Sequence, residues 1–266
     1  MQKLYSLEGY ALKNVIGEGV YAVVFEGKEN STGENKVVKI VYKGSGGARG
    51  AAHARKEIAA LSVLRGERGV PQLEKWLEDK EFFYLVFSCR IGKSLEVPNV
   101  LFGLPEILYV CRSVLETIGN NHRRGVYHLD VKPSNVVATR EGTVLIDFGC
   151  SIVSEEGEIE AGALPFDGTP SYMAPEMVKK PVSQRVDLAG LDVWSFGCFL
   201  HHITTGRDAF TSESIYSLYP KILACEVDYS RVPEPVAGIC RLIFVSDPKK
   251  RIKVSALISC IDSFRV

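Results

Sequence analysis

The pattern of apolar residues changes from strand-like to helical along the chain, and this change limits the possible folds. Residues 10–87 contain runs rich in β-branched and aromatic residues, such as YAVVFEG, NKVVKIVY and FFYLVFS, which are typical of strands. One helical segment interrupts them at residues 51–66. Beyond a linker near residues 88–93, helical patterns dominate, for example at 105–125 and 192–206. We therefore predict an α+β fold with a small β-rich lobe containing one main helix and a larger, mainly helical lobe.

The composition indicates a globular protein without a dominant charge. Its 266 residues are 46% apolar, which is enough to bury a substantial core. The 32 Lys and Arg residues balance the 32 Asp and Glu residues, so the net charge predicts neither a nucleic-acid nor a membrane partner. Seven cysteines are scattered without a C-x-x-C pair, and no apolar run reaches about 18 residues. We expect reduced thiols and an intracellular location, cytoplasmic or nuclear.

A glycine-containing stretch, IGEGVYAVVFEG, lies near the N-terminus. It places Gly17, Gly19 and Ala22 at G-x-G-x-x-G spacing, with alanine instead of the third glycine. A dinucleotide-binding loop would open a helix here, but the following residues continue as a strand, so we predict a β-hairpin tip. Glycines let backbone N–H groups approach phosphate oxygens closely. An ordinary hairpin turn explains the stretch equally well when it is taken alone.

Lys39 lies on the strand that follows this hairpin, with apolar residues on both sides. A buried cation needs a partner, and Glu57 on the predicted helix is a candidate. Together they could hold an ammonium group toward a phosphate. The alternative is a solvated lysine and a solvated glutamate.

Polar residues recur at fixed intervals in two later apolar stretches. VYHLDVKPSNVV contains Asp130, Lys132 and Asn135, and VLIDFGCS contains Asp147. Asn and Asp oxygens suit Mg²⁺, which takes a few protein ligands beside phosphate and water. An aspartate beside them can accept a hydroxyl proton.

These motifs, in this order, resemble the signature of the eukaryotic protein kinases of the serine/threonine type. GEGVYAVV is similar to the Gly-rich loop, VVKI to the strand lysine, HLDVKPSN to the catalytic loop, DFG to the metal-binding motif and APE to the end of the activation segment. DVWSFG resembles the central helix of the larger lobe, where Asp192 would tether the catalytic loop. The resemblance covers nearly the whole chain and implies one bilobal kinase domain, with residues 1–89 and 90–266 as its lobes.

The resemblance implies a role for each matching residue. Phe87 would be the gatekeeper beside the base, and the ATP site would consist of Ile16, Gly17, Gly19, Ala22, Val24, Val37, Lys39, Glu57, Ser88, Arg90 and Val137. Asn135 and Asp147 would bind Mg²⁺, Asp130 would take the acceptor proton, and Lys132 would neutralise the transferring phosphoryl group. In the substrate and activation segment, Thr169 would contact the active site and Glu176 would pair with Arg251.

The implied activity is transfer of the γ-phosphoryl group of ATP to Ser or Thr hydroxyls of protein substrates. A pseudokinase scaffold would be expected to lack Lys39, Asp130 or Asp147, and a small-molecule phosphotransferase would not be expected to carry APE with Arg251. Hints to a subfamily conflict, because HLDVKPSN resembles mitotic inhibitory kinases whereas DFGCS with GTPSYMAPE resembles upstream kinases of mitogen-activated cascades. The physiological substrate and the oligomeric state stay open.

The chain departs from the family pattern at Leu129, where most such kinases have an arginine that anchors a phosphate on the activation segment. The segment from Cys150 to Met173 contains no Lys or Arg and carries the acidic run EEGEIE. We expect activity independent of activation-loop phosphorylation, with the loop ordered by its own packing or by a regulatory protein partner. A second hypothesis docks EEGEIE on His53, Arg55 and Lys56; the alternative is a solvated acidic loop.

Overall fold

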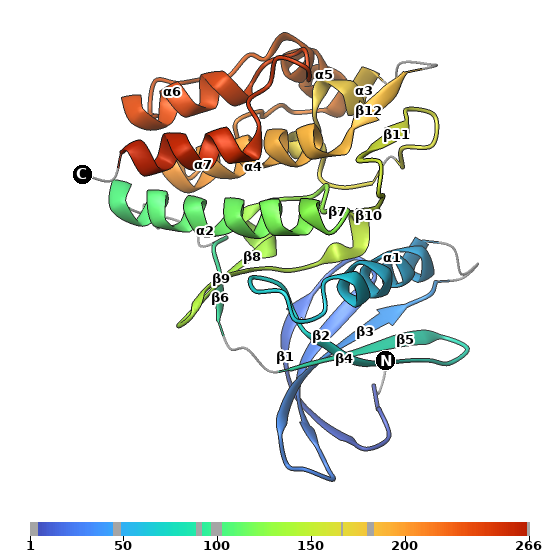
Figure 1. Cartoon of the computed structure of the whole chain (residues 1–266). Helices are drawn as coiled ribbons and strands as arrows, with labels where there is room; N and C mark the ends of the chain where they lie inside the picture. The colour runs from blue at the N-terminus through green and yellow to red at the C-terminus, as the bar shows by residue number, and fades with distance from the viewer. Residues whose placement is uncertain are drawn as a thin grey trace. The chain divides into compact units, whose positions relative to one another are not determined.

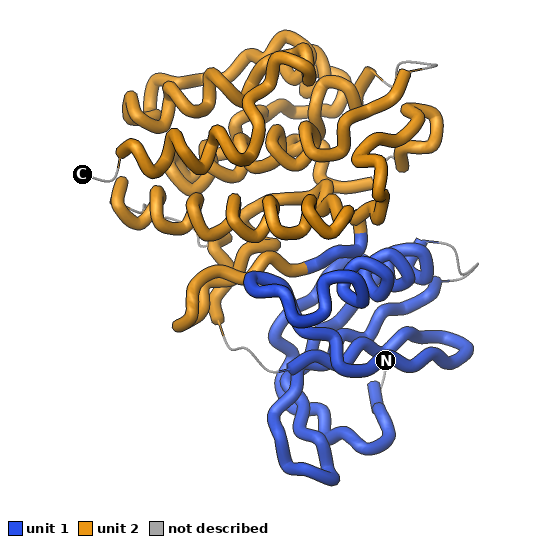
Figure 2. The backbone as a smooth tube through the Cα atoms, in the orientation of Figure 1, with its two compact units in different colours: residues 1–91, 147–149 blue, residues 92–146, 150–266 orange. Residues whose placement is uncertain are grey.

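The computed structural model describes residues 5–44, 49–88, 92–96, 103–165, 167–179 and 184–264. The chain divides into two compact units (Figure 2). The first contains Met1–Ile91 and Asp147–Gly149, and the second contains Gly92–Ile146 and Cys150–Val266. Among the described residues, no helix is both long and apolar enough to cross a membrane.

The first unit is built on a five-stranded antiparallel sheet (Figure 1). Its strand order is β1-β2-β3-β5-β4, and its elements are β1 (Tyr10–Glu18), β2 (Ala22–Glu29), β3 (Asn35–Tyr42), α1 (Arg49–Val63), β4 (Leu73–Glu78) and β5 (Phe82–Ser88). Helix α1 packs on β3, β4 and β5. Side chains alternate along β3, so Val38 and Ile40 join an apolar cluster with Phe25 and Val86, whereas Lys39 points to the other face. Burial on both faces explains why this strand is nearly continuous in apolar residues.

The second unit is mainly helical. Its helices are α2 (Leu104–Arg123), α3 (Pro175–Lys179), α4 (Leu188–Thr205), α5 (Ile215–Ala224), α6 (Glu234–Ile243) and α7 (Val254–Ser263). Its short strands are β6 (Lys93–Ser94), β7 (Val126–Tyr127), β8 (Val136–Thr139), β9 (Gly142–Leu145), β10 (Ile152–Val153), β11 (Glu158–Glu160) and β12 (Arg185–Asp187). The 3₁₀ turns are η1 (Pro133–Asn135), η2 (Phe148–Cys150), which crosses the boundary between the units, and η3 (Pro170–Tyr172).

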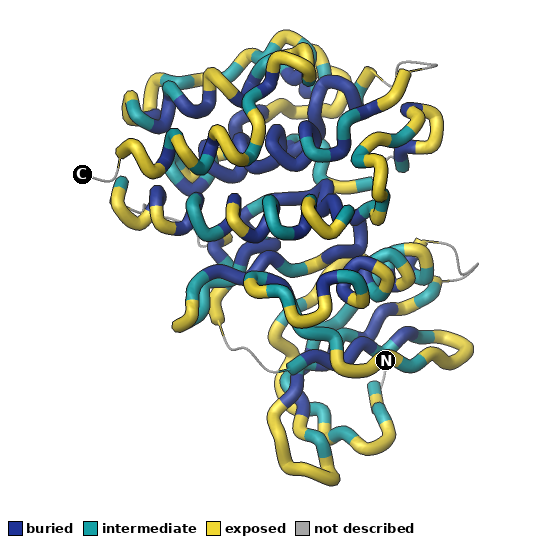
Figure 3. The backbone as a smooth tube through the Cα atoms, viewed as in Figure 1, coloured by how far each residue is buried: buried dark blue, intermediate teal, exposed yellow. Residues whose placement is uncertain are grey.

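Helix α4 is the centre of this unit and is buried along most of its length (Figure 3). It packs against α2 and α6, while α2 also packs against α7. The Trp194 ring stacks on Phe210 at a centroid distance of 5.5 Å and meets Phe244 edge-on at 5.1 Å. A helix that is apolar on all sides needs such enclosure. Asp187 caps the helix by accepting from the N–H of Ala189.

The predicted fold class, a sheet-rich N-terminal part and a mainly helical C-terminal part, is confirmed. Two details differ. The expected helix at residues 51–66 ends at Val63, because the chain turns before Gly66, which has a positive φ of 82°. Helix α5 was not expected from the sequence; it contains Pro220, which normally marks a helix end, but here lies in a helix packed against α3 and η3.

Candidate active site

The glycine stretch forms a β-hairpin, as predicted. Gly17 lies on β1 and Ala22 begins β2, and the N–H of Gly19 donates to the carbonyl of Ala22 at 2.8 Å across the turn. Val20 at the tip is 89% exposed, so the tip is not packed into the core of its unit. The hairpin therefore offers an exposed backbone turn at one end of the sheet.

Several residues predicted for the ATP site share one face of this sheet. Val24 lies directly opposite Lys39 on the neighbouring strand, and Val37 lies opposite Phe87. Directly paired residues point to the same side, and residues two apart on a strand do also, so these four side chains are on one face. Gly17 pairs with Val24 and therefore adds its bare backbone to that face.

The remaining predicted ATP-site residues are not assigned to this shared face. Ile16 is 51% exposed on β1. The N–H of Ser88 already donates to the carbonyl of Gln72 at 3.2 Å. Arg90 lies outside the described residues. Val137 lies on β8 of the second unit, paired with Val144 of β9.

Lys39 is held between two carboxylates within the first unit. Its Nζ lies 2.7 Å from Glu57 Oε2 and 2.8 Å from Asp147 Oδ1. The Glu57 side chain is only 3% exposed, whereas that of Asp147 is 49% exposed. Burial alone would lower the pKa of Lys39, but the two carboxylates outweigh burial and hold this pKa above its ordinary value. The Lys39 ammonium is therefore charged, and it is fixed beside the half-exposed carboxylate of Asp147.

The catalytic-loop backbone of the second unit is tethered to helix α4. Asp192 accepts the N–H of His128 at 2.9 Å and that of Leu129 at 2.7 Å, and His122 Nε2 lies 2.8 Å from its Oδ2. Although burial raises the pKa of Asp192, these partners lower it further than burial raises it. Leu129 adopts a positive φ of 64°, an uncommon conformation for a branched residue that the tether helps to hold.

Donors converge on the Asp130 carboxylate, which is nearly buried. Asn135 Nδ2 donates to the Asp130 carbonyl at 2.9 Å and to its Oδ2 at 3.2 Å, and Lys132 Nζ lies 2.7 Å from the same oxygen. The N–H of Thr169 donates to Asp130 Oδ1 at 3.0 Å, and Lys132 also donates to the Thr169 hydroxyl at 2.7 Å. An acid, a cation, an amide and a hydroxyl thus form one rigid cluster. Such a cluster can accept a proton and neutralise negative charge.

Glu176 and Arg251 form a bidentate ion pair, with distances of 2.7 and 3.0 Å. Their side chains are 8% and 1% exposed. Arg251 also donates to the carbonyls of Gly190 and Val245 and lies over the Trp194 ring. The family resemblance predicted this pair. His122, the partner of Asp192, was missed, because none of the motifs that carry the resemblance includes His122.

The activation segment is held by backbone pairing inside the second unit. Strand β10 pairs with β7, and β11 pairs with β12, which directly precedes α4. Arg185 contacts Glu156 and lies 3.2 Å from Glu158. Arg185 is therefore one partner of the acidic run, and docking of the run on His53, Arg55 and Lys56 stays a prediction. Arg55 itself pairs with Glu78 at 3.2 Å.

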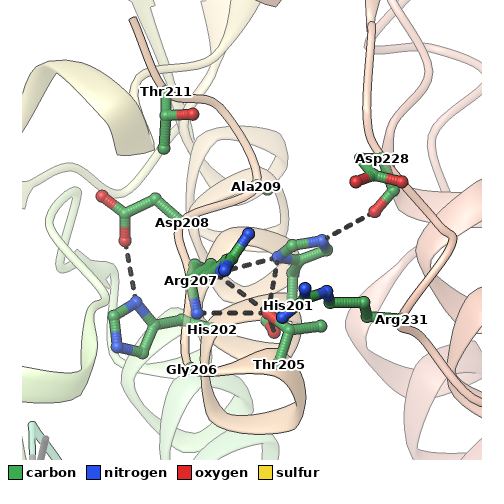
Figure 4. Close-up of a pocket in the computed structure, with 10 residues that line it drawn as sticks. All are labelled: His201, His202, Thr205, Gly206, Arg207, Asp208, Ala209, Thr211, Asp228 and Arg231. Carbon is green, nitrogen blue, oxygen red and sulfur yellow. Dashed lines mark hydrogen bonds and ion pairs between the residues drawn. The ribbon is translucent and has the colours of Figure 1, made fainter.

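A pocket of about 370 Å³ lies beyond the end of α4 (Figure 4). The adjacent histidines on its wall face apart: His201 contacts the carbonyls of Arg207 and Asp228, whereas His202 contacts the Asp208 carboxylate. Among the described residues, no three His, Cys, Asp or Glu side chains gather as metal ligands would.

The chain resembles known proteins along most of its length. Residues 10–260 match the model of the protein kinase domain family. Similar proteins include CBL-interacting serine/threonine-protein kinase 16 of Arabidopsis thaliana, 29% identical over 93% of this chain and 55% of the relative. Calcium/calmodulin-dependent protein kinase type II of Caenorhabditis briggsae is 29% identical over 92% and 47%, and calcium-dependent protein kinase 27 of Arabidopsis thaliana is 26% identical over 94% and 53%.

The chain spans about half the length of these curated relatives. The family match, in contrast, leaves only short stretches at the two ends uncovered and includes every charged cluster described above. On this match, the chain belongs to the protein kinase domain family.

Proposed function

We propose that the protein is an ATP-dependent serine/threonine protein kinase, which transfers the γ-phosphoryl group of ATP to Ser or Thr hydroxyls of protein substrates. The observation that carries this proposal is the Lys39 ammonium, fixed at 2.7 Å from a buried carboxylate and 2.8 Å from a half-exposed one. A pseudokinase scaffold would be expected to lack Lys39, Asp130 or Asp147, and this chain has all three. Every charged catalytic position of the family motif is also filled, at Lys39, Asp130, Lys132 and Asp147.

The residues of the first unit suit nucleotide binding. The shared sheet face would place Val24 and Val37 against the adenine ring, and Phe87 would close one end as gatekeeper. The exposed hairpin would cover the phosphates with its backbone N–H groups, and Lys39 would hold two of them. The roles proposed for Ile16, Ser88, Arg90 and Val137 in ATP binding rest on the family resemblance alone.

The donor set fits Mg²⁺. Asn135 uses its amide nitrogen to bond Asp130, and these bonds do not involve its amide oxygen. Asp147 offers a carboxylate that is 49% exposed. Oxygen ligands of this kind suit a hard cation that keeps water and phosphate as further ligands. When bound, Mg²⁺ would neutralise charge on the phosphates. Within the second unit, Ile146 donates its N–H to the Asn135 carbonyl at 2.8 Å, which helps to fix the backbone that carries the Asn135 side chain.

Asp130 would orient the acceptor hydroxyl and take its proton, while Lys132 would stabilise the charge that develops on the phosphoryl group. Because Lys132 also donates to the Thr169 hydroxyl, the activation segment is connected to this chemistry. The pairing of Lys132 with Thr169, and the Arabidopsis thaliana relative named as a serine/threonine-protein kinase, favour Ser and Thr acceptors.

Radiolabelled ATP with a generic basic protein tests the activity. The wild-type protein is expected to label the substrate, and Asp147→Asn is expected to lower the rate about 10²- to 10³-fold, because it removes the carboxylate proposed to bind Mg²⁺ and to pair with Lys39. Asp262→Asn on α7 is the matched control, because it makes the same change at a side chain that is 42% exposed. Nucleotide binding without transfer by the wild-type protein would instead indicate a pseudokinase scaffold.

We further propose that activity does not depend on activation-loop phosphorylation. Leu129, at the position of the usual phosphate-binding arginine, is 7% exposed and belongs to the apolar core of its unit. The pairing of β10 with β7 and of β11 with β12 would order the segment without a phosphate. The ion pairs of Arg185 are solvent-exposed and would add little.

Phosphatase treatment is therefore expected to leave kcat within about twofold of the value for the untreated protein, since exposed charges contribute little to the order of the segment. Alanine at Ser151 and Ser154 in turn, with phosphate measured by mass spectrometry, gives the matched set. Thr169 is a poor test because it contacts Lys132 directly, and Ser171 is a poor test because its hydroxyl donates to Asp208. Loss of activity that follows the loss of a measured phosphate would contradict this proposal.

The chain would work as one kinase domain, with residues 1–89 and 90–266 as its lobes. An intracellular location, cytoplasmic or nuclear, would suit thiols such as Cys111 and Cys198, which are buried and not in disulfides. Relatives whose names refer to calcium, calmodulin or CBL proteins favour a regulatory protein partner here too.

A further inference from the structure

Donors from the activation segment converge on one carboxylate outside the cluster around Asp130. Asp208 Oδ2 accepts from the Ser171 hydroxyl at 3.1 Å, and Oδ1 accepts from the Tyr172 hydroxyl at 3.0 Å. His202 Nδ1 lies 2.8 Å from the same Oδ1, and Figure 4 shows the two side chains facing each other. A carboxylate only accepts, so the imidazole must carry its hydrogen on Nδ1.

The local fold places this carboxylate firmly. Helix α4 ends at Gly206, which has a positive φ of 70° and donates its N–H to the His202 carbonyl at 2.7 Å. The carbonyl of Arg207 contacts both Thr205 Oγ1 and the buried His201 ring. Asp208 follows directly, so its backbone is held by the end of the helix rather than by the activation segment.

The donor residues belong to the turn η3, which directly follows Thr169. The N–H of Tyr172 donates to the Thr169 carbonyl at 2.9 Å, and the N–H of Met173 donates to the Pro170 carbonyl at 3.2 Å. Thr169 in turn bonds Asp130 and Lys132. A continuous series of short bonds therefore connects Asp208 to the cluster proposed to transfer the phosphoryl group.

The electrostatics favour an ionised Asp208. Burial raises its pKa, but the bonds from His202, Tyr172 and Ser171 outweigh burial and lower it below its ordinary value. Burial and the nearby carboxylate raise the pKa of Tyr172, which therefore stays a donor. Bonds from neutral donors to an ionised acceptor are about twice as strong as bonds between neutral groups.

We propose that Asp208 is a positioning residue: through Ser171 and Tyr172 it fixes the turn that presents Thr169 to Asp130 and Lys132. This inference rests on the proposed kinase function. The Tyr172 ring is buried and would stay in place without Asp208, whereas the orientation of its hydroxyl and of the Ser171 side chain would be lost.

The test compares Asp208→Ala with Asp228→Asn in the purified full chain. Asp228 lines the same pocket (Figure 4), and its carboxylate accepts the N–H of Ser230 at 2.9 Å in its own loop. The change to Asn leaves the contact of its backbone carbonyl with His201 in place. Asp208→Ala is expected to lower kcat on a peptide substrate about tenfold, the size of one charge-assisted hydrogen bond, with KM for ATP unchanged. Asp228→Asn is expected to stay within about twofold.

Amide hydrogen exchange gives a readout that does not need activity. Exchange at Tyr172 and Met173 is expected to accelerate about tenfold in Asp208→Ala and to stay unchanged in Asp228→Asn, because only the first releases the turn. If Asp208→Ala fails to fold, Tyr172→Phe removes one donor, keeps the ring and is expected to accelerate the same amides. Ser171→Ala removes the other donor, the Ser171 hydroxyl.

Unchanged amide exchange at Tyr172 and Met173 in every folded variant would overturn the inference. An equal loss of kcat in Asp208→Ala and Asp228→Asn would also overturn it. If the wild-type protein transferred no phosphoryl group, the proposed function would be wrong. The role of Asp208 in fixing the turn would still be decided by the amide hydrogen exchange measurements.

Discussion

Replacing Lys39 with Met is expected to lower kcat for phosphoryl transfer about 10²- to 10³-fold, because it removes a fixed positive charge from the place where phosphate charge would lie. Lys39 does not reach this place by chance. Two carboxylates, at 2.7 and 2.8 Å, hold its ammonium, and one of them is buried on α1. Initial rates with radiolabelled ATP and a basic protein measure the loss.

The same substitution is also expected to destabilise the first unit, by about 1–3 kcal/mol, because it leaves Glu57 buried without its cation. The double variant Lys39→Met/Glu57→Gln removes the unpaired charge as well. We expect it to recover most of the free energy of unfolding while kcat stays low. This pair of variants separates the catalytic role of the ammonium from its structural role.

The pH dependence of the single variant gives a further check. Burial already raises the pKa of Glu57, and loss of Lys39 removes the main opposing influence. A folded-state pKa above the unfolded value means that stability is present at low pH and is lost as pH rises through the folded-state pKa. Lys39→Met is therefore expected to be less destabilised at about pH 5 than at about pH 8. A variant that retains more than about one tenth of wild-type kcat would contradict the proposed role of Lys39.

The sequence predicted those parts of the site that local pattern controls. Lysine in the middle of an apolar strand requires a partner, and a helix following that strand offered Glu57. The hairpin was predictable because Tyr21 to Phe25 continue as a strand instead of opening a helix. In both cases, neighbouring residues carry the physical constraint.

Contacts between distant segments could not be predicted from local pattern, and those that were predicted, such as Glu176 with Arg251, came from the family resemblance. The residues that meet Asp208 come from a turn and a helix end that are far apart along the chain, and a single loop aspartate carries no signal. Strand β11 consists of Glu158–Glu160, whose charges suggested either a docking contact or a solvated loop and gave no sign of a strand, yet it pairs with β12 through its backbone. Backbone pairing of short segments leaves little trace in side-chain identity.

Replacing Arg251 with Ala is expected to have the largest effect on stability, lowering the free energy of unfolding of the second unit by about 3–5 kcal/mol, because it leaves the Glu176 carboxylate buried without a cation. Arg251 is 1% exposed, bonds both Glu176 oxygens and donates to the carbonyls of Gly190 and Val245. It also lies 5.0 Å above the Trp194 ring. Urea denaturation followed by tryptophan fluorescence suits this measurement, since the buried Trp194 lies in the affected core and Trp76 is 47% exposed in the other unit.

The controls distinguish the specific bidentate pairing of Arg251 with Glu176 from a general need for a positive charge. Arg241→Ala removes an arginine whose pair with Glu234 is exposed on both sides, so the expected loss is below about 1 kcal/mol. Arg251→Lys keeps the charge but cannot bond both oxygens and both carbonyls, so an intermediate loss is expected. The double variant Arg251→Met/Glu176→Gln should recover part of the loss, because no charge then stays buried alone. If Arg251→Ala were no more destabilising than Arg241→Ala, the Glu176 carboxylate would have to be solvated or protonated, and the pair would not anchor the end of the activation segment to the helical core.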